Sequence, residues 1–238
     1  MPVKSQAFCR MGGLLSLLLV SACAHHTEDL APPPPLAKPQ TVQVSSRTNL
    51  WSGDWTPLFD GKTLTNWDVT DFGGHGEVSV ASGQINIGMG AELSGITWTN
   101  GTLPKTDYEI SLQTMKVDGG DFFCGLTFPV ADSSCSLIIG GWGGGVVGLS
   151  SLDDNDASEN ETTRSLAFKT GQWYEVRLRV TPAKIEAWLD KEKIIDVSIV
   201  GRKVSLRPGS IYLSEPLGIA TYETSAAIRD FKLRPIEH

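Results

Sequence analysis

The stretch WYEVRLRV, residues 173–180, decides the fold class because its apolar and polar side chains alternate. Such alternation places the apolar side chains on one face of a β-strand and the polar side chains on the other. A second alternating run, KIEAWLD at residues 184–190, follows a turn that contains Pro182. The two runs are therefore predicted to form an antiparallel hairpin with one buried face.

Other parts of the chain repeat this strand pattern. Alternating runs occupy residues 108–113, 194–197 and 228–233, and no stretch predicts an amphipathic helix of three turns. The chain also has 25 glycines, which suit tight turns and close packing of sheets. We expect residues 51–238, a segment of 188 residues, to form one all-β domain with two sheets packed as a sandwich.

The N-terminal residues carry the pattern of a bacterial lipoprotein signal. Lys4 and Arg10 precede an apolar stretch at residues 14–20, and the sequence VSAC then leads to Cys23. The apolar stretch is much shorter than the ~20 residues that span a bilayer, which favours a cleaved signal over a membrane helix. Cleavage before Cys23 would leave a lipid-anchored protein, whereas an ordinary signal peptide is the alternative. Because Ala24 follows the cysteine in place of an acidic residue, we expect an outer-membrane lipoprotein.

The segment after the signal, residues 23–50, is predicted to be a tether because four consecutive prolines at 32–35 make it stiff and extended. Removal of residues 1–22 leaves 18 basic and 27 acidic residues, a formal charge of −9. That charge argues against a nucleic-acid partner and against adhesion to anionic lipids. The lipid on Cys23 is therefore the expected contact with the membrane.

Two cysteines remain in the mature domain, Cys124 and Cys135, since Cys9 lies in the signal and Cys23 is the lipidation site. In an oxidising compartment we expect a disulfide between them, which would stabilise the fold by ~3 kcal/mol. A metal site built from the two thiolates is the alternative, but no histidine lies near either cysteine in the sequence.

Three segments together resemble a known family. The opening segment WTPLFDGKTLTNW at 55–67, the paired runs within 173–190 and the closing run IRDFKL at 228–233 are similar to the 3-keto-disaccharide hydrolase domain family. The resemblance extends over residues 51–236 and implies a jelly-roll sandwich of the concanavalin A-like lectin and glucanase type, with one curved sheet that offers a sugar-sized surface. Many members carry a Tyr-Glu-x-Gln-Ile strand and a histidine before the last strand. Here the corresponding residues 135–145 are CSLIIGGWGGG, and residues 218–224, GIATYET, contain no histidine.

Two residues between 119 and 145 are suited to a sugar site. Asp121 stands at the head of an aromatic strand, and Trp142 lies between pairs of glycines. An indole ring can stack on the apolar face of a pyranose while glycines leave room for the ligand. Alternatively, Trp142 packs in the core and the glycines allow strands to approach closely. The sequence leaves both readings of Trp142 open.

A loop rich in carboxylates and amides follows at residues 153–163, DDNDASENETT. Asp156 and Asn160 are candidate partners for sugar hydroxyls, and Glu159 is a candidate base. Oxygen donors alternate along this loop, so a calcium ion is considered as a cofactor. However, Glu159 and Ser165 occupy places where an EF-hand needs glycine and glutamate. A solvated acidic loop is the alternative, and no metal-binding residue is assigned.

The resemblance implies an enzyme that cleaves 3-keto-glycosides. A keto group at C3 acidifies the proton on C2, and a carboxylate, Asp121 or Glu159, would remove that proton before the group on C1 leaves and water adds. The residues expected to bind the saccharide are Trp142, Asp156, Asn160, Arg177 and Trp188. The alternative is a carbohydrate-binding surface lipoprotein that releases no product.

Overall fold

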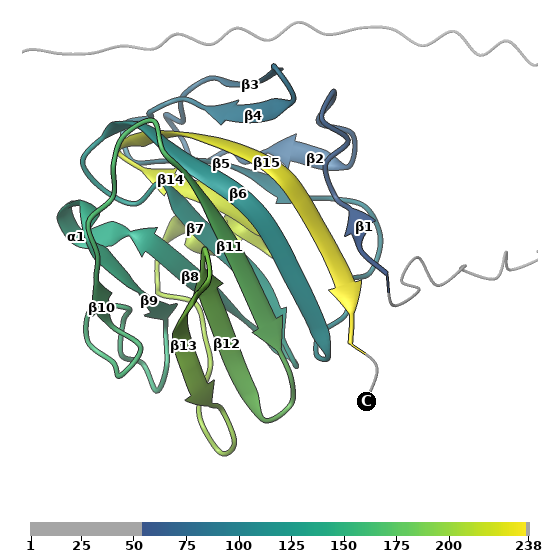
Figure 1. Cartoon of the computed structure of the whole chain (residues 1–238), viewed down its shortest axis with the longest axis vertical. Coiled ribbons are helices and arrows are strands. Elements are labelled where there is room, and N and C mark those ends of the chain that lie inside the picture. The colour runs from purple at the N-terminus through teal and green to yellow at the C-terminus, as the bar shows by residue number, and fades with distance from the viewer. Residues whose placement is uncertain (1–53, 237–238) are drawn as a thin grey trace, which may run out of the picture. The chain divides into compact units, whose positions relative to one another are not determined.

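The computed structural model describes residues 54–236, which fold into two antiparallel β-sheets packed face to face (Figure 1). The predicted all-β sandwich is therefore confirmed. The predicted signal at 1–22, the lipidation site Cys23 and the tether at 23–50 lie outside the described residues and stay predictions. Within residues 54–236, no helix has the length and apolar character that a membrane crossing requires.

The first sheet, called sheet A here, consists in spatial order of β13 (Glu192–Ser198), β12 (Lys184–Leu189), β11 (Trp173–Val180), β6 (Tyr108–Gly119), β15 (Thr224–Pro235), β4 (Gln84–Ile87) and β3 (Val78–Ala81), with β1 (Thr56–Pro57) paired to β15. The second, sheet B, consists of β10 (Arg164–Ser165), β9 (Val146–Ser150), β8 (Ser133–Gly140), β7 (Cys124–Val130), β14 (Gly218–Tyr222), β5 (Leu93–Trp98) and β2 (Trp67–Val69). Two short helices, α1 (Gly141–Gly144) and η1 (Ser210–Ser214), lie between strands.

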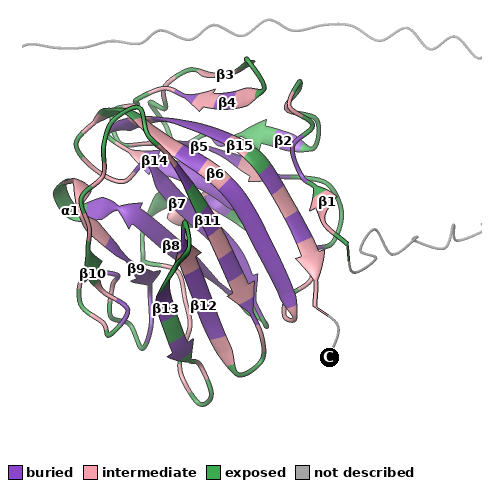
Figure 2. Ribbon diagram, viewed as in Figure 1, coloured by how far each residue is buried: buried purple, intermediate pink, exposed green. Residues whose placement is uncertain are grey.

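The hairpin predicted from the alternating runs is present as β11 and β12. The two strands pair in antiparallel register from Val176↔Leu189 to Val180↔Ile185. The connecting turn is closed by the N–H of Thr181, which donates to the carbonyl of Lys184 at 3.0 Å. Figure 2 shows the alternation directly, because buried and more exposed residues follow one another along β11. The period-2 pattern therefore determines which face of β11 turns to the core.

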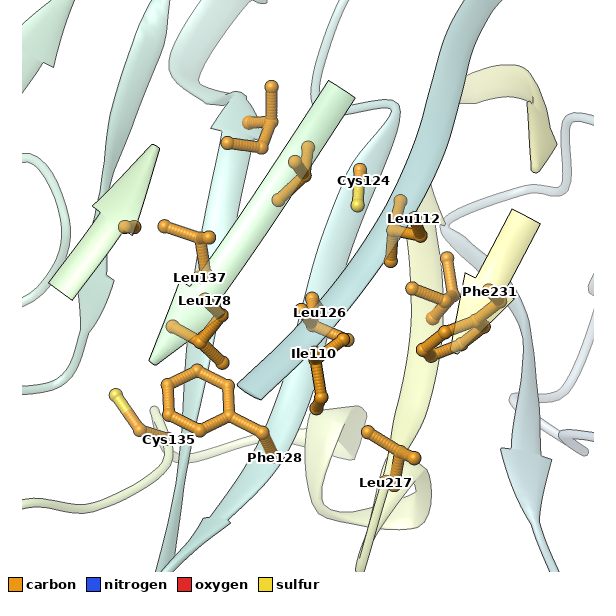
Figure 3. Packing of buried hydrophobic residues seen from close by; sticks show 14 of the residues in the cluster. Ile110, Leu112, Cys124, Leu126, Phe128, Cys135, Leu137, Leu178, Leu217 and Phe231 are labelled. Carbon is orange, nitrogen blue, oxygen red and sulfur yellow. The ribbon is translucent and has the colours of Figure 1, made fainter. Parts of the chain in front are cut away.

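The core is a single apolar layer between the two sheets (Figure 3). Sheet A contributes Ile110 and Leu178, and sheet B contributes Leu126, Phe128 and Leu137, all of them fully buried. Because side chains alternate along each strand, the residues between these core positions must point away from the core to the outer face of their sheet. Each sheet thus has an outer face made of the polar and small residues that the core does not use.

The opening segment of the family resemblance closes one edge of this core. Leu58, Phe59 and Trp67 are buried, and the indole N–H of Trp67 donates to the carbonyl of Leu58 at 2.7 Å. The turn between them is held by Asp60, whose carboxylate accepts the backbone N–H groups of Lys62 and Thr63 at 2.7 Å each. The opening segment therefore has a structural role in this chain, because it packs its apolar side chains into the core.

The predicted disulfide between Cys124 and Cys135 is wrong, because both cysteines are free and buried. They lie on neighbouring strands but out of register, with Cys124 opposite Ile139 and Cys135 opposite Phe128. Four residues of offset correspond to about 13 Å along a strand, whereas a disulfide needs Cα atoms within about 7 Å. Figure 3 shows the two sulfur atoms well apart in the core. Burial raises the pKa of each thiol to about 12, so both behave as apolar core side chains.

Candidate functional site

A cavity of about 400 Å³ lies over the outer face of sheet B. Its floor includes Ser136 and Ile138 of β8 and Ser150 of β9, which alternate with core residues and therefore point outward. Its walls come from five separate parts of the chain: residues 92–93 at the start of β5, residues 121–122 before β7, Trp142 in α1, residues 207–211, and Tyr222 at the end of β14. The cavity thus gathers segments that lie far apart in the sequence.

Trp142 stands at the cavity wall because of an unusual turn. Glycines 140, 143 and 144 have φ values of 84°, 84° and 100°, which residues with a side chain rarely adopt. Trp142 itself has φ 49° and ψ 57°, also in the left-handed region. This conformation directs the indole away from the core, so that 41% of Trp142 is exposed. Of the two readings of Trp142, core packing is therefore the wrong one.

Asp121 holds this turn in place. Its Oδ2 accepts the backbone N–H of Gly143 at 2.8 Å, and its Oδ1 accepts the N–H of Phe122 at 2.8 Å. The backbone N–H of Asp121 in turn donates to Oγ1 of the buried Thr224 at 2.9 Å. A carboxylate can accept about four hydrogen bonds, so Asp121 retains acceptor capacity toward the cavity. The structure thus brings Asp121 and Trp142 together, as expected from the sequence.

A second aromatic element faces the same cavity. The rings of Phe122 and Tyr222 lie 5.9 Å apart with planes tilted by 31°. The N–H of Tyr222 donates to the carbonyl of Phe122 at 3.0 Å, which ties the end of β14 to the segment before β7. Both residues are partly exposed and line the cavity. The wall therefore presents apolar ring surface together with a phenol hydroxyl.

Arg207 brings a positive charge to the cavity. Its Nη1 lies 3.0 Å from Oδ2 of Asp156, and its guanidinium carbon lies 5.7 Å from the centre of the Trp142 ring. Asp156 does not itself line the cavity; its Oδ1 accepts the hydroxyl of Ser150 and the N–H of Ala157. Asp156 is therefore placed to orient Arg207 rather than to contact a ligand.

The acidic loop at 153–163 forms ion pairs with residues 202–203, which precede Arg207 in the chain. Asp153 and Glu161 both pair with Arg202, and Asp154 pairs with Lys203 at 2.7 Å. The backbone N–H of Lys203 and the guanidinium of Arg202 lower the pKa of Asp153, and Arg202 likewise lowers the pKa of Glu161. These carboxylates thus attach the segment before Arg207 to the body of the domain.

The oxygen donors of this loop, for which the sequence raises a calcium ion as a candidate ligand, are engaged within the protein. Asp154 and Asp156 are engaged by basic side chains, and the amide of Asn160 donates to the carbonyls of Leu149 and Asp156 at 2.8 and 2.7 Å. Within residues 54–236, no three acidic, histidine or cysteine side chains are arranged to hold a metal ion. The oxygen donors that alternate in the sequence stabilise the loop itself.

Several residues proposed from the sequence lie away from the cavity. Glu159 is exposed and does not line it. Asn160 is occupied as a support of the loop. Arg177 and Trp188 lie next to each other, with the guanidinium carbon 3.9 Å from the ring centre, but they belong to β11 and β12 of sheet A. They point to the outer face of that sheet, on the opposite side of the sandwich.

Sequence reasoning missed Arg207 and Tyr222, which line the cavity. Tyr222 lies in the segment 218–224, which departs from the family pattern in its lack of a histidine and carries no other local mark of a binding site. Arg207 follows no recognisable motif, and its position depends on ion pairs with a loop about fifty residues earlier in the chain. A Pro-Gly pair directly after it, at 208–209, was the only local sign of a turn.

The comparison with protein families matches residues 54–234 to the 3-keto-alpha-glucoside-1,2-lyase-like domain. The chain belongs to this family. A comparison with curated protein sequences found no match. The segment 135–145, which departs from the common family pattern, includes most of β8, and β8 contributes Ser136 and Ile138 to the cavity floor. Part of the segment that departs from the common pattern therefore lies at the candidate site.

Several solved structures match this chain at low sequence identity, and one of them has a TM-score above 0.5. The carbohydrate recognition domain of Emp46p matches with a TM-score of 0.51 and 15% identity, covering 79% of this chain and 99% of that chain. A carbohydrate-binding module from Bacillus subtilis matches with a TM-score of 0.49 and 12% identity, over 71% of this chain and 95% of that one. A putative glycosyl hydrolase from Parabacteroides distasonis matches with a TM-score of 0.46 and 15% identity, over 77% and 94%. These similarities concern the fold.

Proposed function

We propose that the domain binds a saccharide in the cavity over sheet B. The observation that carries this proposal is the indole of Trp142, which is 41% exposed at the cavity wall. Exposure of a large ring forgoes about 1.5–3 kcal/mol of burial, and a non-glycine residue in the left-handed region costs a further 1–2 kcal/mol or so. A ligand that stacks on the ring would recover the first of these costs.

The cavity's mixed chemistry suits a sugar. A pyranose has apolar C–H faces and an edge of hydroxyl groups. The rings of Phe122, Trp142 and Tyr222 offer surfaces for the faces, and Asp121 and Arg207 offer an acceptor and a donor for the hydroxyls. The volume of about 400 Å³ lies within the range of roughly 300–1,000 Å³ that small-molecule sites occupy.

Titration calorimetry with a panel of glucosides and their 3-keto derivatives tests the proposal. Trp142→Ala should weaken binding about ten-fold, because a stacking contact is worth roughly 1 kcal/mol beyond the buried area. Tyr212→Ala is the matched control, since Tyr212 is an exposed aromatic residue that does not line the cavity. Equal affinities of the Trp142→Ala and wild-type proteins would refute saccharide stacking at this site.

Cleavage of 3-keto-glycosides is the second candidate, and membership of the lyase-like family favours it. The base would be Asp121, which lines the cavity, rather than Glu159, which does not. Asp121 would take the C2 proton on an oxygen lone pair left free by its two backbone contacts, and the guanidinium of Arg207 would stabilise the negative charge that develops on the substrate. The departure of residues 135–145 from the family pattern and the lack of a histidine in residues 218–224 favour binding without cleavage.

Product analysis by NMR with a 3-keto-glucoside separates binding from cleavage. If the protein is an enzyme, Asp121→Asn should lower the rate at least a hundred-fold, far more than it weakens binding, while Glu159→Gln should have no effect on either. A binding protein would show affinity without any released sugar. Cleavage that survives Asp121→Asn would show that the base is a different group.

We also propose that the chain is exported and anchored to the outer membrane through a lipid on Cys23, which rests on the signal pattern at residues 1–23. Labelling of cells with radioactive palmitate should mark the wild-type protein, and Cys23→Ala should lose the label. Cys9→Ala is the matched control because Cys9 lies within the predicted signal. A wild-type protein without label would contradict the anchor.

A further inference from the structure

The charges that line the cavity over sheet B are not balanced. Its charged lining residues are Glu92, Asp121 and Arg207. The guanidinium of Arg207 lies 3.0 Å from the carboxylate of Asp156, which does not itself line the cavity, so its positive charge is already compensated. Within residues 54–236, no basic side chain forms an ion pair with Glu92 or Asp121. A ligand in the cavity therefore meets two negative charges that the protein leaves uncompensated.

The two carboxylates stand on either side of Tyr222. Asp121 comes just before β7 and Glu92 just before β5, and both of these strands pair antiparallel with β14. The starts of β7 and β5 therefore lie at the same end of sheet B. Tyr222, at the end of β14, lies between them, because its N–H donates to the carbonyl of Phe122 at 3.0 Å and it stands opposite Leu93 in register.

Aromatic rings form the wall between the two carboxylates. The rings of Phe122 and Tyr222 lie 5.9 Å apart and both line the cavity, and the exposed ring of Trp142 adds a third apolar surface. The face of an aromatic ring carries negative potential and attracts cations. The rings and the carboxylates thus favour the same kind of ligand group, a cation.

The two carboxylates differ in what they can offer to such a group. Asp121 accepts the backbone N–H groups of Gly143 and Phe122, which are neutral donors, so the residue is fixed in place and its charge remains. Glu92 is exposed, and its backbone carbonyl accepts the N–H of Glu223 at 3.0 Å. Among the described residues, no donor is bound to the carboxylate of Glu92. Glu92 is therefore the carboxylate that is open to a ligand.

One further cation comes near the turn that carries Trp142. The Nζ of Lys116 would lie 3.5 Å from a Cβ added at Gly144. Lys116 does not line the cavity, and its ammonium forms no ion pair with Asp121. It weakens the field of Asp121 from outside the cavity without contacting a ligand, so the balance of charge inside the cavity stays negative.

We propose that the saccharide bound in this cavity is an amino sugar whose free amine carries a proton. The proposal rests on the saccharide binding proposed above and names the class of sugar. The ammonium lies at the wall formed by Phe122 and Tyr222 and donates to the carboxylate of Glu92. Asp121 adds its charge to the attraction, and Arg207 remains available to ring hydroxyls. A protonated amino sugar matches both the exposed stacking ring and the two uncompensated carboxylates of this cavity.

Titration calorimetry at low ionic strength and mildly acidic pH, with three disaccharides of the same linkage, tests the proposal. The disaccharides are those of glucosamine, glucose and N-acetylglucosamine, and acetylation keeps the sugar ring but removes the charge of the amine. The wild-type protein should bind the glucosamine disaccharide about ten-fold more tightly than either of the others, because hydrogen bonds to charged groups are the stronger ones.

Two variants locate the recognition of the amine. Glu92→Gln should lower the affinity for the glucosamine disaccharide about five-fold, which is the upper end for an exposed ion pair, and so reduce its advantage over the glucose disaccharide. Glu223→Gln is the matched control, since Glu223 is an exposed carboxylate that does not line the cavity, and it should leave both affinities unchanged. Thermal unfolding of each variant confirms that the fold is retained.

The outcomes separate this inference from the proposed function. Equal affinities of the wild type for the glucosamine and glucose disaccharides, both weakened by Trp142→Ala, would overturn the amino sugar and leave saccharide binding in place. Binding of none of the three disaccharides would overturn both. An equal loss in Glu223→Gln would indicate diffuse attraction rather than contact with Glu92. Equally tight binding of the N-acetylglucosamine disaccharide would show that the charge of the amine is not recognised.

Discussion

Replacement of Glu109 by glutamine should destabilise the domain strongly, although the residue lies on the outer face of sheet A. Its side chain is fully buried beneath Arg179 and Arg234, each of which is 35% exposed. Glutamine keeps the shape but removes the charge, so Arg234 loses its carboxylate partner and Arg179 keeps only Glu186, at 3.8 Å. Breaking a buried ion pair from one side costs about 3–5 kcal/mol. The partial exposure of both arginines favours the lower end, about 3 kcal/mol.

Thermal and urea unfolding followed by circular dichroism measure this cost. For a domain of this size, a loss of 3 kcal/mol corresponds to a fall in Tm of about 6–12 °C. Glu175→Gln is the matched control, since Glu175 is an exposed carboxylate on the neighbouring strand and a surface substitution should change stability by less than about 0.5 kcal/mol. A loss below about 1 kcal/mol in Glu109→Gln would refute the view that the arginine pair depends on this carboxylate.

The stabilising effect of Glu109 should also depend on pH. Burial alone would raise the pKa of Glu109, but hydrogen bonds from Arg234 and Arg179 outweigh it, so the pKa lies below its usual value of 4.5. A carboxylate with a lowered pKa stabilises the fold fully above that usual value and loses its contribution as the pH falls through the folded-state pKa. The difference in unfolding free energy between the wild type and Glu109→Gln should therefore shrink below pH 4.5. A difference that is independent of pH would contradict this.

Three further predictions concern the core, the acidic loop and the cavity wall. Addition of dithiothreitol should leave the Tm of the protein unchanged, because Cys124 and Cys135 are free; a fall in Tm would indicate a disulfide. Gly148→Ala should lower the unfolding free energy by about 2 kcal/mol in urea titrations, since the added Cβ would lie 2.6 Å from the carbonyl oxygen of Ala157. Gly171→Ala is a variant for comparison. Its Cβ would have nothing within 4 Å, but its φ is +78°, so it measures the cost of backbone strain without a steric clash. Asp156→Asn should cost about 1 kcal/mol of stability, and it should weaken saccharide binding because Arg207 loses its ion pair with Asp156. Calorimetry at low and high salt measures the affinity, and an unchanged affinity in the variant at both salt concentrations would contradict a role for this ion pair.

The fold class and the buried face of each strand follow from local patterns. In β11 the apolar side chains recur at every second residue, which a pleated strand converts into one buried face whatever its neighbours are. The hairpin follows in the same way, because its turn connects two runs that are adjacent in the chain. The pairing of Cys124 with Cys135 could not be judged by such means. Whether two cysteines on adjacent strands lie opposite each other depends on the register in which the strands pair. The amino-acid pattern of β7 and β8 does not reveal that register.

The sequence alone thus determined an all-β sandwich and its family, and it named Asp121 and Trp142 as candidates while it left open whether Trp142 packs in the core. The glycines around the tryptophan suit either reading, and only the structure shows that they form a turn of positive φ that exposes the ring. Only the tertiary structure decided which of the other polar residues share a site. The acidic loop forms ion pairs with a segment some fifty residues later in the chain. Arg177 and Trp188 lie on sheet A, on the other side of the sandwich from the cavity. Both placements depend on long-range ion pairs and on the order of strands in the sheets, which a local alternation of side chains does not reveal.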